Sequence, residues 1–478
     1  MQRKSRVFSA FLTFLTVAPG IALAQAIPPA VPGGGIVLPS AQQAFGSAVT
    51  ETVSAAPLKL SLDDAIQRGL KANLAILERE TAGRTASASR MQFLTALRPT
   101  LRGEISENLQ QNNLATFGFR FGGFPQIIGP FGYTDMRAIG QMNLYDRVSR
   151  KNLAVADQQI RAVQLSAQDA RDLVVEAVAN AYLTIIADGA RVEAAHSEAE
   201  TAKVLFENAR DRHSAGVSPA IDELRAQVGW KSRQQRELAE KNRLEKDKLV
   251  LARAIGVPGG QGIELTDNAP YSPLEGMSAE EVVKRARDGR ADLKSARAQL
   301  QAAELSRQAV LARRYPTLSV GANYGVNGVN MAQSHGTFGV AGALKFDIYD
   351  GGRMQGELAQ TDAVIQQRKN EIADLEGRIE QEVRSALLDL QSAADQVSVA
   401  QSNREVANQT LTQARDRFNA GVTDNIEVVQ AQDALANAEE SLISSLYAHN
   451  LAKVALARSI GAAEANLKQF MKSASATK

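Results

Sequence analysis

The sequence predicts a mainly α-helical protein with a smaller β part, in which one unit of helices and strands is duplicated. Three observations lead to this prediction. Prolines are absent between Pro130 and Pro219 and after Pro316, which leaves two long intervals free for helices. Between the helical stretches the hydrophobic pattern changes to a period of two, which is typical of strands. Segments of the first half also recur in the second half at nearly constant offsets.

The composition excludes several functional classes. The chain has 478 residues, with 54 Lys and Arg against 52 Asp and Glu, so its charge gives no reason to expect nucleic acid as a partner. It has no Cys, which excludes disulfides, thiolate metal sites, a Cys nucleophile and a Cys-attached lipid. Its four His show no ligand spacing, and no Ser/His/Asp arrangement or phosphate loop is present. We therefore expect no cofactor, no metal site and no enzymatic activity.

Residues 1–26 are expected to be a secretory signal peptide. Three basic residues precede a mostly apolar stretch, Val7–Ala18, and the small residues Ala22 and Ala24 form a cleavage site. The stretch is too short to span a bilayer, and a short N-terminal anchor is the alternative. Residues 27–57 are rich in Pro, Gly, Ala and Val and predict an extended or disordered lead. No later stretch approaches 18 uninterrupted apolar residues, so no helical membrane span is expected.

The internal repeat sets the expected domain boundaries. Residues 209–217 (ARDRHSAGV) recur as residues 414–422 (ARDRFNAGV) at an offset of 205. Shorter matches give offsets of 217 before the strands and 204 after them, so the first half carries 13 extra residues in between. We expect a first repeat over 58–260 with a β-hairpin at about 100–145, a linker over 261–277, a second repeat over 278–465 with a hairpin at about 317–349, and a C-terminal tail over 466–478.

Each repeat is expected to hold one very long helix and two shorter ones. In the first repeat the long helix covers Asp146–His213, which at 1.5 Å per residue is roughly 100 Å. Ser61–Leu97 and Ala220–Ile255 together have nearly the same length, so we expect them to stack end to end beside it. In the second repeat, apolar residues from Ile372 to Val397 recur every three or four positions, which indicates a narrow packing stripe.

Each predicted hairpin has one apolar face and one face of polar or small residues, as in the alternation from Leu318 to Gly325. A soluble hairpin with one buried face is one interpretation, but a hairpin joined to so long a helix has no obvious core to cover. In an exported protein, a lipid bilayer is a natural place to bury such a face. Open sheet edges cannot exist in hydrocarbon, so the strands must close into a barrel. Four strands per chain are too few, and a homotrimer would supply 12.

These features resemble the outer-membrane efflux protein (TolC-like) family over roughly Leu58 to Phe470. The resemblance rests on the paired Ala-Gly-Val turns with a downstream Ala-Gln, the Tyr349–Arg353 exit from strand to helix, and the Ile-Gly helix ends at Gly256 and Gly461. The family implies a homotrimeric outer-membrane β-barrel continued by a periplasmic α-helical barrel. It also implies a passive exit duct for efflux or secretion, coupled through a periplasmic adaptor (membrane fusion) protein to an inner-membrane pump of the RND, ABC or MFS class.

The resemblance also assigns roles to particular residues. The helix tips that would contact the adaptor are Gly216, Val217, Ser218, Gly421, Val422 and Thr423. Asp222, Glu427 and Phe418 would lie at the periplasmic aperture, where carboxylates from three chains favour cations. Polar strand positions that would face the lumen are Arg102, Glu104, Ser319, Asn323 and Lys345. Two alternatives stay open: the glycines are turn residues without a partner, and the two acids stabilise helix N-termini, a role compatible with the first.

Some positions depart from the family pattern. Thr423 stands where a family member has Arg, so Asp222 has no salt-bridge partner there. Gln430 replaces a second acid, which predicts a more weakly charged mouth, and Phe418 lacks the hydroxyl of a Tyr. The resting state, the cargo (drugs, metals or proteins) and the role of the 109–133 loop, expected outside the cell, stay open. A periplasmic coiled-coil adaptor or rod without membrane insertion is the alternative, which hairpins flanked by long helices on both sides disfavour.

Overall fold

The computed structural model describes residues 46–49, 52–54, 56–118, 125–267, 271–274, 277–420, 422–423 and 425–471. All of them belong to one compact unit, Leu38–Lys478. The expected signal peptide, most of the expected lead and Gly421 lie outside the described residues. Of the lead, Ser47 forms a β-bridge with Asn73, and the Ala48 N–H donates to the carbonyl of Ala72 at 2.9 Å.

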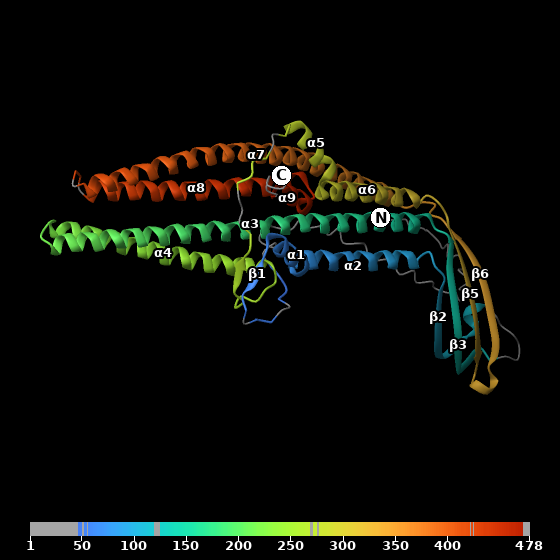
Figure 1. Cartoon of the computed structure of the whole chain (residues 1–478). Coiled ribbons are helices and arrows are strands. Elements are labelled where there is room, and N and C mark those ends of the chain that lie inside the picture. Colours follow the sequence, from blue (N-terminus) through green and yellow to red (C-terminus); the bar gives the residue numbers. More distant parts are fainter. Residues whose placement is uncertain are drawn as a thin grey trace, which may run out of the picture. The chain divides into compact units, whose positions relative to one another are not determined.

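The helices of the unit repeat one order in the two halves (Figure 1). They are α1 (Leu62–Ala72), α2 (Leu74–Thr95), α3 (Arg147–Ser214), α4 (Ala220–Ala254), α5 (Ala279–Gly289), α6 (Ala291–Ala312), α7 (Arg353–Asn419), α8 (Asn425–Ile460) and α9 (Ala463–Met471). Helix α3 has 68 residues and α7 has 67, and α4 begins and ends within one residue of the expected range. The predicted long helices and the duplication are confirmed.

The predicted apolar stripe of α7 is also confirmed. Leu375, Ile379, Val383, Leu390 and Val397 are all buried and follow one another at intervals of four or seven residues. Small buried alanines lie between them, which allows the neighbouring helices to approach closely. Helix α3 includes an 18-residue stretch whose composition would suit a membrane span, but 56% of that stretch is buried inside the chain.

The first helix of each repeat is broken, contrary to the single helix expected over Ser61–Leu97. Asn73 separates α1 from α2 with ψ at 132°, and its side-chain oxygen accepts the N–H of Ala75 at 2.9 Å. Asn73 is completely buried, because residues 46–49 pack over this break. In the second repeat the equivalent break lies at Arg290, which separates α5 from α6 with ψ at 130°.

The strands form two sheets. The larger one has the order β2 (Thr100–Asn113), β3 (Ile127–Tyr145), β5 (Thr317–Gly328) and β6 (His335–Lys345), with every neighbouring pair antiparallel. It lies at the end of the unit opposite the α3–α4 and α7–α8 turns (Figure 1). The smaller sheet pairs β1 (Leu58–Leu60) with β4 (Ile263–Leu265) in parallel. The expected 261–277 linker therefore contains a strand that ties it to the start of the first repeat.

Three expected boundaries need correction. The second hairpin ends at Lys345 rather than near 349, because Gly351 and Gly352 both adopt positive φ and turn the chain into α7. Much of the expected 109–133 loop is paired strand, since β2 runs to Asn113 and β3 begins at Ile127. The boundary at 465 falls inside α9, whose Leu467 and Phe470 are buried in the main core.

The main core lies midway along the long helices. Its fully buried side chains come from both repeats, and they include Tyr182, Leu251, Leu293, Ile379 and Leu456. The Tyr182 hydroxyl donates to the carbonyl of Leu60 at 3.0 Å, which ties α3 to the small sheet. Because apolar burial is concentrated here, this region holds the two helical hairpins together and leaves their ends to weaker contacts.

Candidate functional site at the helix turns

The turn between α3 and α4 is closed by backbone bonds around one glycine. The Val217 N–H donates to the carbonyl of Arg212 at 2.9 Å, and the Gly216 N–H donates to the carbonyl of His213 at 2.9 Å. Gly216 has a φ of +70°, a conformation that costs other residues roughly 1–2 kcal/mol. The sequence therefore ends α3 with the common glycine-based cap and starts α4 directly after Pro219.

The turn between α7 and α8 repeats two bonds of the first turn. The Val422 N–H donates to the carbonyl of Arg417 at 3.0 Å, as Val217 does to Arg212. The Ala420 N–H donates to the carbonyl of Asp416 at 3.0 Å, as the Ala215 N–H does to Asp211 at 3.0 Å. The duplicated sequence motif thus encodes a duplicated backbone structure. Val217 and Val422, the residues that follow each glycine, are 74% and 69% exposed. The two tips therefore present apolar side chains to the surroundings.

The two acids of the expected aperture lie in equivalent first turns of α4 and α8. Asp222 is 3.9 Å from Arg225, one turn further along its own helix. Glu427 accepts a hydrogen bond from Arg417 at 2.8 Å and a second one from the Thr423 hydroxyl. Both positions suit the helix N-terminus, as the alternative interpretation expected. The structure also gives Thr423 a partner, since its hydroxyl binds Glu427 within the same turn.

Phe418 links the second tip to the first hairpin. It packs beside a small cluster of buried residues, Leu411, Ala414, Val428 and Ala431. The guanidinium carbon of Arg212, on α3, lies 4.5 Å from the centre of the Phe418 ring. The ring is therefore held by a cation–π contact in place of the hydroxyl bond that a Tyr would offer. Arg212 is the counterpart of Arg417 in the first copy of the motif, and Phe418 directly follows Arg417. The sequence alone did not indicate this contact.

A second set of contacts ties the hairpins together further from the tips. We call it the inter-hairpin network: Arg191 and Glu198 on α3, Arg233 on α4, and Asp433 and Glu440 on α8. Arg191 donates to Glu440 at 3.0 Å, and Arg233 donates to Glu198 at 2.6 Å and also to Asp433. The side chains of Arg191 and Arg233 are only 10% and 16% exposed, so water screens these pairs weakly.

Burial and neighbouring charges shift the pKa values around this network. Burial alone would lower the pKa of Arg191, but its hydrogen bonds with Glu440 and Asp188 raise it. Burial and a hydrogen bond with Asp188 raise the pKa of Asp247 on α4. Arg191 therefore stays charged in the physiological pH range, and its guanidinium joins α3 to Glu440 of α8.

The five polar strand residues expected in the lumen share one face of the large sheet. Arg102 and Asn323 are both paired with Ile139, and Ser319 and Lys345 belong to the same set of alternating positions. Glu104 is opposite Arg137. On the other face the side chains are apolar and largely exposed in the single chain: Leu101, Ile105, Leu109, Phe338 and Val340 are 71–81% exposed. The sheet thus has one apolar face and one polar face.

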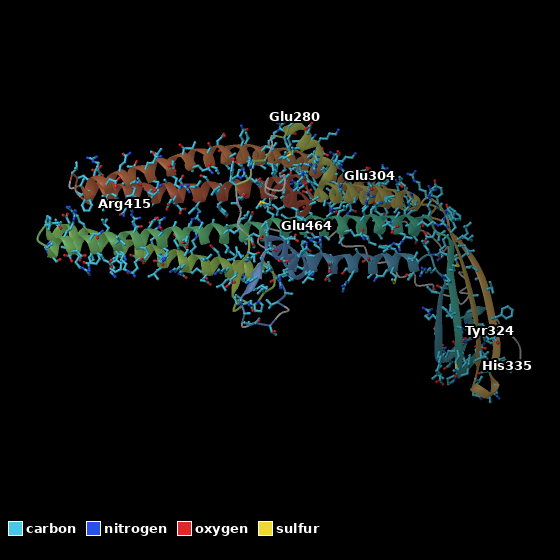
Figure 2. The ribbon with its side chains drawn as sticks, viewed as in Figure 1. Glu280, Glu304, Tyr324, His335, Arg415 and Glu464 are labelled. Atoms are coloured by element: carbon cyan, nitrogen blue, oxygen red, sulfur yellow. The ribbon has the colours of Figure 1, made fainter. Side chains whose placement is uncertain are left out.

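In the described residues, no group of three or more His, Asp or Glu is placed to hold a metal ion. What the geometry offers instead is a pair of equivalent helical tips at one end and a two-faced sheet at the other. Figure 2 shows this separation, with Arg415 near the tip of α7 and Tyr324 and His335 on the strands.

Comparisons with known proteins agree with this arrangement. The family model "Outer membrane efflux protein" matches residues 282–462. The outer membrane protein OprJ of Pseudomonas aeruginosa is 26% identical over 67% of this chain and 68% of its own length. The toluene efflux pump outer membrane protein TtgC of Pseudomonas putida is 25% identical over 60% of each chain. The outer membrane protein VceC of Vibrio cholerae, 19% identical, superimposes with a TM-score of 0.71 over 84% of this chain and 96% of its own.

The fold and the paired tips define an outer-membrane channel of the efflux class, with its helical part in the periplasm. Residues 282–462 match the outer membrane efflux protein family, and the described chain has the fold of its TolC-like channels. It is the exit duct of a tripartite efflux system. The family implies a trimer that works with an adaptor and an inner-membrane pump, and its members are channels rather than enzymes.

Proposed function

We propose that the duct exports small molecules and that its adaptor docks on the two helix tips, Gly216–Ser218 and Gly421–Thr423. The observation that carries the proposal is the pair of structurally equivalent turns, each followed by an exposed valine. Single exposed apolar residues are ordinary, but two at the ends of the same pair of hairpins suit a repeated partner. TtgC is named for the efflux of toluene, and a 24% identical relative, OpmQ of Pseudomonas aeruginosa, is named for the export of pyoverdine. Both names favour small molecules as cargo over secreted proteins.

The pump that supplies the duct belongs to the RND, ABC or MFS class, and the aperture is formed by Asp222, Glu427 and Phe418. Two carboxylates per chain would give a trimer a negatively charged mouth, weakened by the Arg417–Glu427 bond. The polar strand face with Arg102, Glu104, Ser319, Asn323 and Lys345 would line the barrel. Passage needs no chemistry on the cargo, and the partner pump would supply the energy.

The docking proposal is tested in a host that lacks its own outer-membrane efflux channel. The Val217→Asp/Val422→Asp variant is expected to lose most of the resistance to toxic compounds that the unchanged chain restores, because a charge in each tip contact would be desolvated on docking. Val53→Asp is the matched control, since Val53 is 58% exposed and lies in the lead far from the tips. Equal resistance in both variants, at equal amounts of outer-membrane trimer, would remove the tips from the docking surface.

The aperture proposal predicts a change in ion selectivity. Asp222→Asn combined with Glu427→Gln is expected to lower the preference for cations of single trimers in planar bilayers, because the mouth loses its carboxylates. Reversal potentials under a salt gradient measure this preference. An unchanged reversal potential would leave the two acids with their helix-terminal role alone.

The trimeric assembly is tested by light scattering of the protein in detergent, with the detergent mass subtracted. A mass of three chains supports the duct, whereas a soluble monomer would indicate a periplasmic rod.

A further inference from the structure

The four connections between the large sheet and the helices all lie at the same edge of the sheet (Figure 1). They are residues 95–100, 145–151, 312–317 and 345–353. In an outer-membrane barrel followed by periplasmic helices, this edge is the periplasmic rim. Together these short segments hold eight Lys and Arg against three Asp, although the whole chain is nearly neutral. The rim is therefore far more basic than the rest of the protein.

The acids of the rim are mostly occupied in capping helices. Asp146 accepts the Ser149 N–H at 2.9 Å at the start of α3. Asp350 accepts the N–H groups of Gly352 and Met354, each at 3.0 Å, at the start of α7. Among the described residues, no carboxylate lies within 4 Å of Arg98, Arg147, Arg150 or Arg314; the ion pairs of the rim involve other cations. These four arginines are exposed.

Two of these arginines are stacked on tyrosines. The guanidinium carbon of Arg147 lies 4.1 Å from the centre of the Tyr315 ring, and that of Arg150 lies 6.0 Å from that of Tyr145. We call the four arginines and these two tyrosines the rim belt. Cationic side chains beside tyrosine rings are typical of the boundary between hydrocarbon and water, where the ring meets the acyl chains and the charge reaches the headgroups.

The belt continues directly from the apolar face of the sheet. Just beyond the end of β6, Phe346 is 60% exposed, Ile348 is 90% exposed and Tyr349 is 89% exposed. Apolar side chains of this size are unsuited to a water-filled lumen, so their exposure points outward, toward lipid. Lys345, in contrast, belongs to the polar face of the sheet and is left out of the belt.

We propose that the rim belt binds the anionic headgroups of phospholipids in the periplasmic leaflet of the outer membrane. Guanidinium groups form two parallel hydrogen bonds with phosphate, and each cation near an anionic surface strengthens the attraction. The rim belt would thereby fix the height of the barrel in the membrane. This inference rests on the outer-membrane location and is independent of how the tips dock an adaptor.

Native mass spectrometry of the trimer in mixed micelles tests the proposal. The probes are phosphatidylglycerol, which is anionic, and phosphatidylcholine, which has no net charge. The fourfold Arg→Gln variant at residues 98, 147, 150 and 314 is expected to retain at least fivefold less phosphatidylglycerol, with retained phosphatidylcholine unchanged. The fourfold Arg→Lys variant keeps the charges and is expected to retain most of the phosphatidylglycerol that the unchanged chain retains. A matched control replaces Arg378, Arg384, Arg404 and Arg415 of α7 by Gln and is expected to behave like the unchanged chain.

Several outcomes would overturn the proposal. If the belt variant retains as much phosphatidylglycerol as the unchanged chain, or if the α7 control loses as much as the belt variant, the belt does not select the lipid. Complete competition by soluble glycerol phosphate would indicate a site for free phosphate instead. Bilayer conductance of the unchanged chain and of the belt variant is measured in parallel. A conducting belt variant with unchanged lipid retention refutes the belt alone, whereas an unchanged chain that forms no channel contradicts the duct itself.

Discussion

Arg233→Glu is expected to separate the two helical hairpins near their tips. The substitution places a carboxylate next to Glu198 and Asp433, the two acids that Arg233 binds in the inter-hairpin network. Glu198 is 12% exposed, so its charge would lose its main partner in a weakly screened place. Removal of one partner from such a pair costs roughly 3 kcal/mol. We expect this loss to appear as greater mobility of the tips rather than as unfolding, because the main core lies midway along the long helices.

Spin labels measure that mobility directly, since the chain has no native Cys. With labels at Val217→Cys and Val422→Cys, and labelled protomers diluted into unlabelled trimers, Arg233→Glu is expected to lengthen and broaden the distance distribution. Mean conductance in planar bilayers is expected to rise with it. Lys241→Glu is the control, because Lys241 lies on the same helix and its ion pair, with Glu237, stays within α4.

The charge swap makes this prediction specific. Asp433→Arg alone would bring two cations together, whereas Arg233→Glu with Asp433→Arg restores the α4–α8 pair in reverse. The double variant is expected to recover much of the narrow distance distribution, which is the signature of direct coupling between two residues. Additive effects of the two single changes would show that the pair does not hold the hairpins, and that the cluster around Phe418 carries the contact.

The sequence predicted the elements that depend on local patterns. Proline placement located α3 and α7, the period of two located the strands, and the duplicated motif located both turns. It did not predict the break at Asn73, because the apolar period runs through this position and the cause is the packing of residues 46–49 over it. The sequence pattern places the extra residues of the first half in a loop, whereas in the structure they mainly lengthen β2 and β3.

The candidate site was predicted less completely than the fold. The motif identified the turn glycines and the first-turn acids, which are local features. It gave no sign of the Arg212–Phe418 contact or of the inter-hairpin network. The partners that join the two hairpins in these contacts stand 200 or more residues apart in the chain. An ordinary Arg on an exposed helix face and one that bridges two hairpins have the same local sequence signal. Only the way in which the two repeats pack together distinguishes them.

Gly256→Ala is expected to be the most damaging change among the equivalent glycines that end helices. Gly256 has a φ of +74°, and a Cβ at this position would lie 2.4 Å from the Cβ of Ala72 and 3.2 Å from the carbonyl oxygen of Ala48. The backbone strain costs about 1–2 kcal/mol, and the overpacked contact adds about 1–3 kcal/mol. The contact joins the end of α4 to the end of α1, so the damage falls on the main core.

A graded series separates the two contributions. Gly461 has a φ of +86° and its nearest neighbour to an added Cβ is the backbone of Arg290 at 3.1 Å, whereas an added Cβ at Gly216 has no neighbour within 4 Å. The loss of thermal stability, followed by helical circular dichroism, is therefore expected to be largest for Gly256→Ala, intermediate for Gly461→Ala and smallest for Gly216→Ala. Gly229→Ala, inside α4 and with open space around it, is expected to raise stability slightly. Equal losses at Gly256 and Gly216 would mean that backbone strain alone decides, and that the packing between α1 and α4 yields without cost.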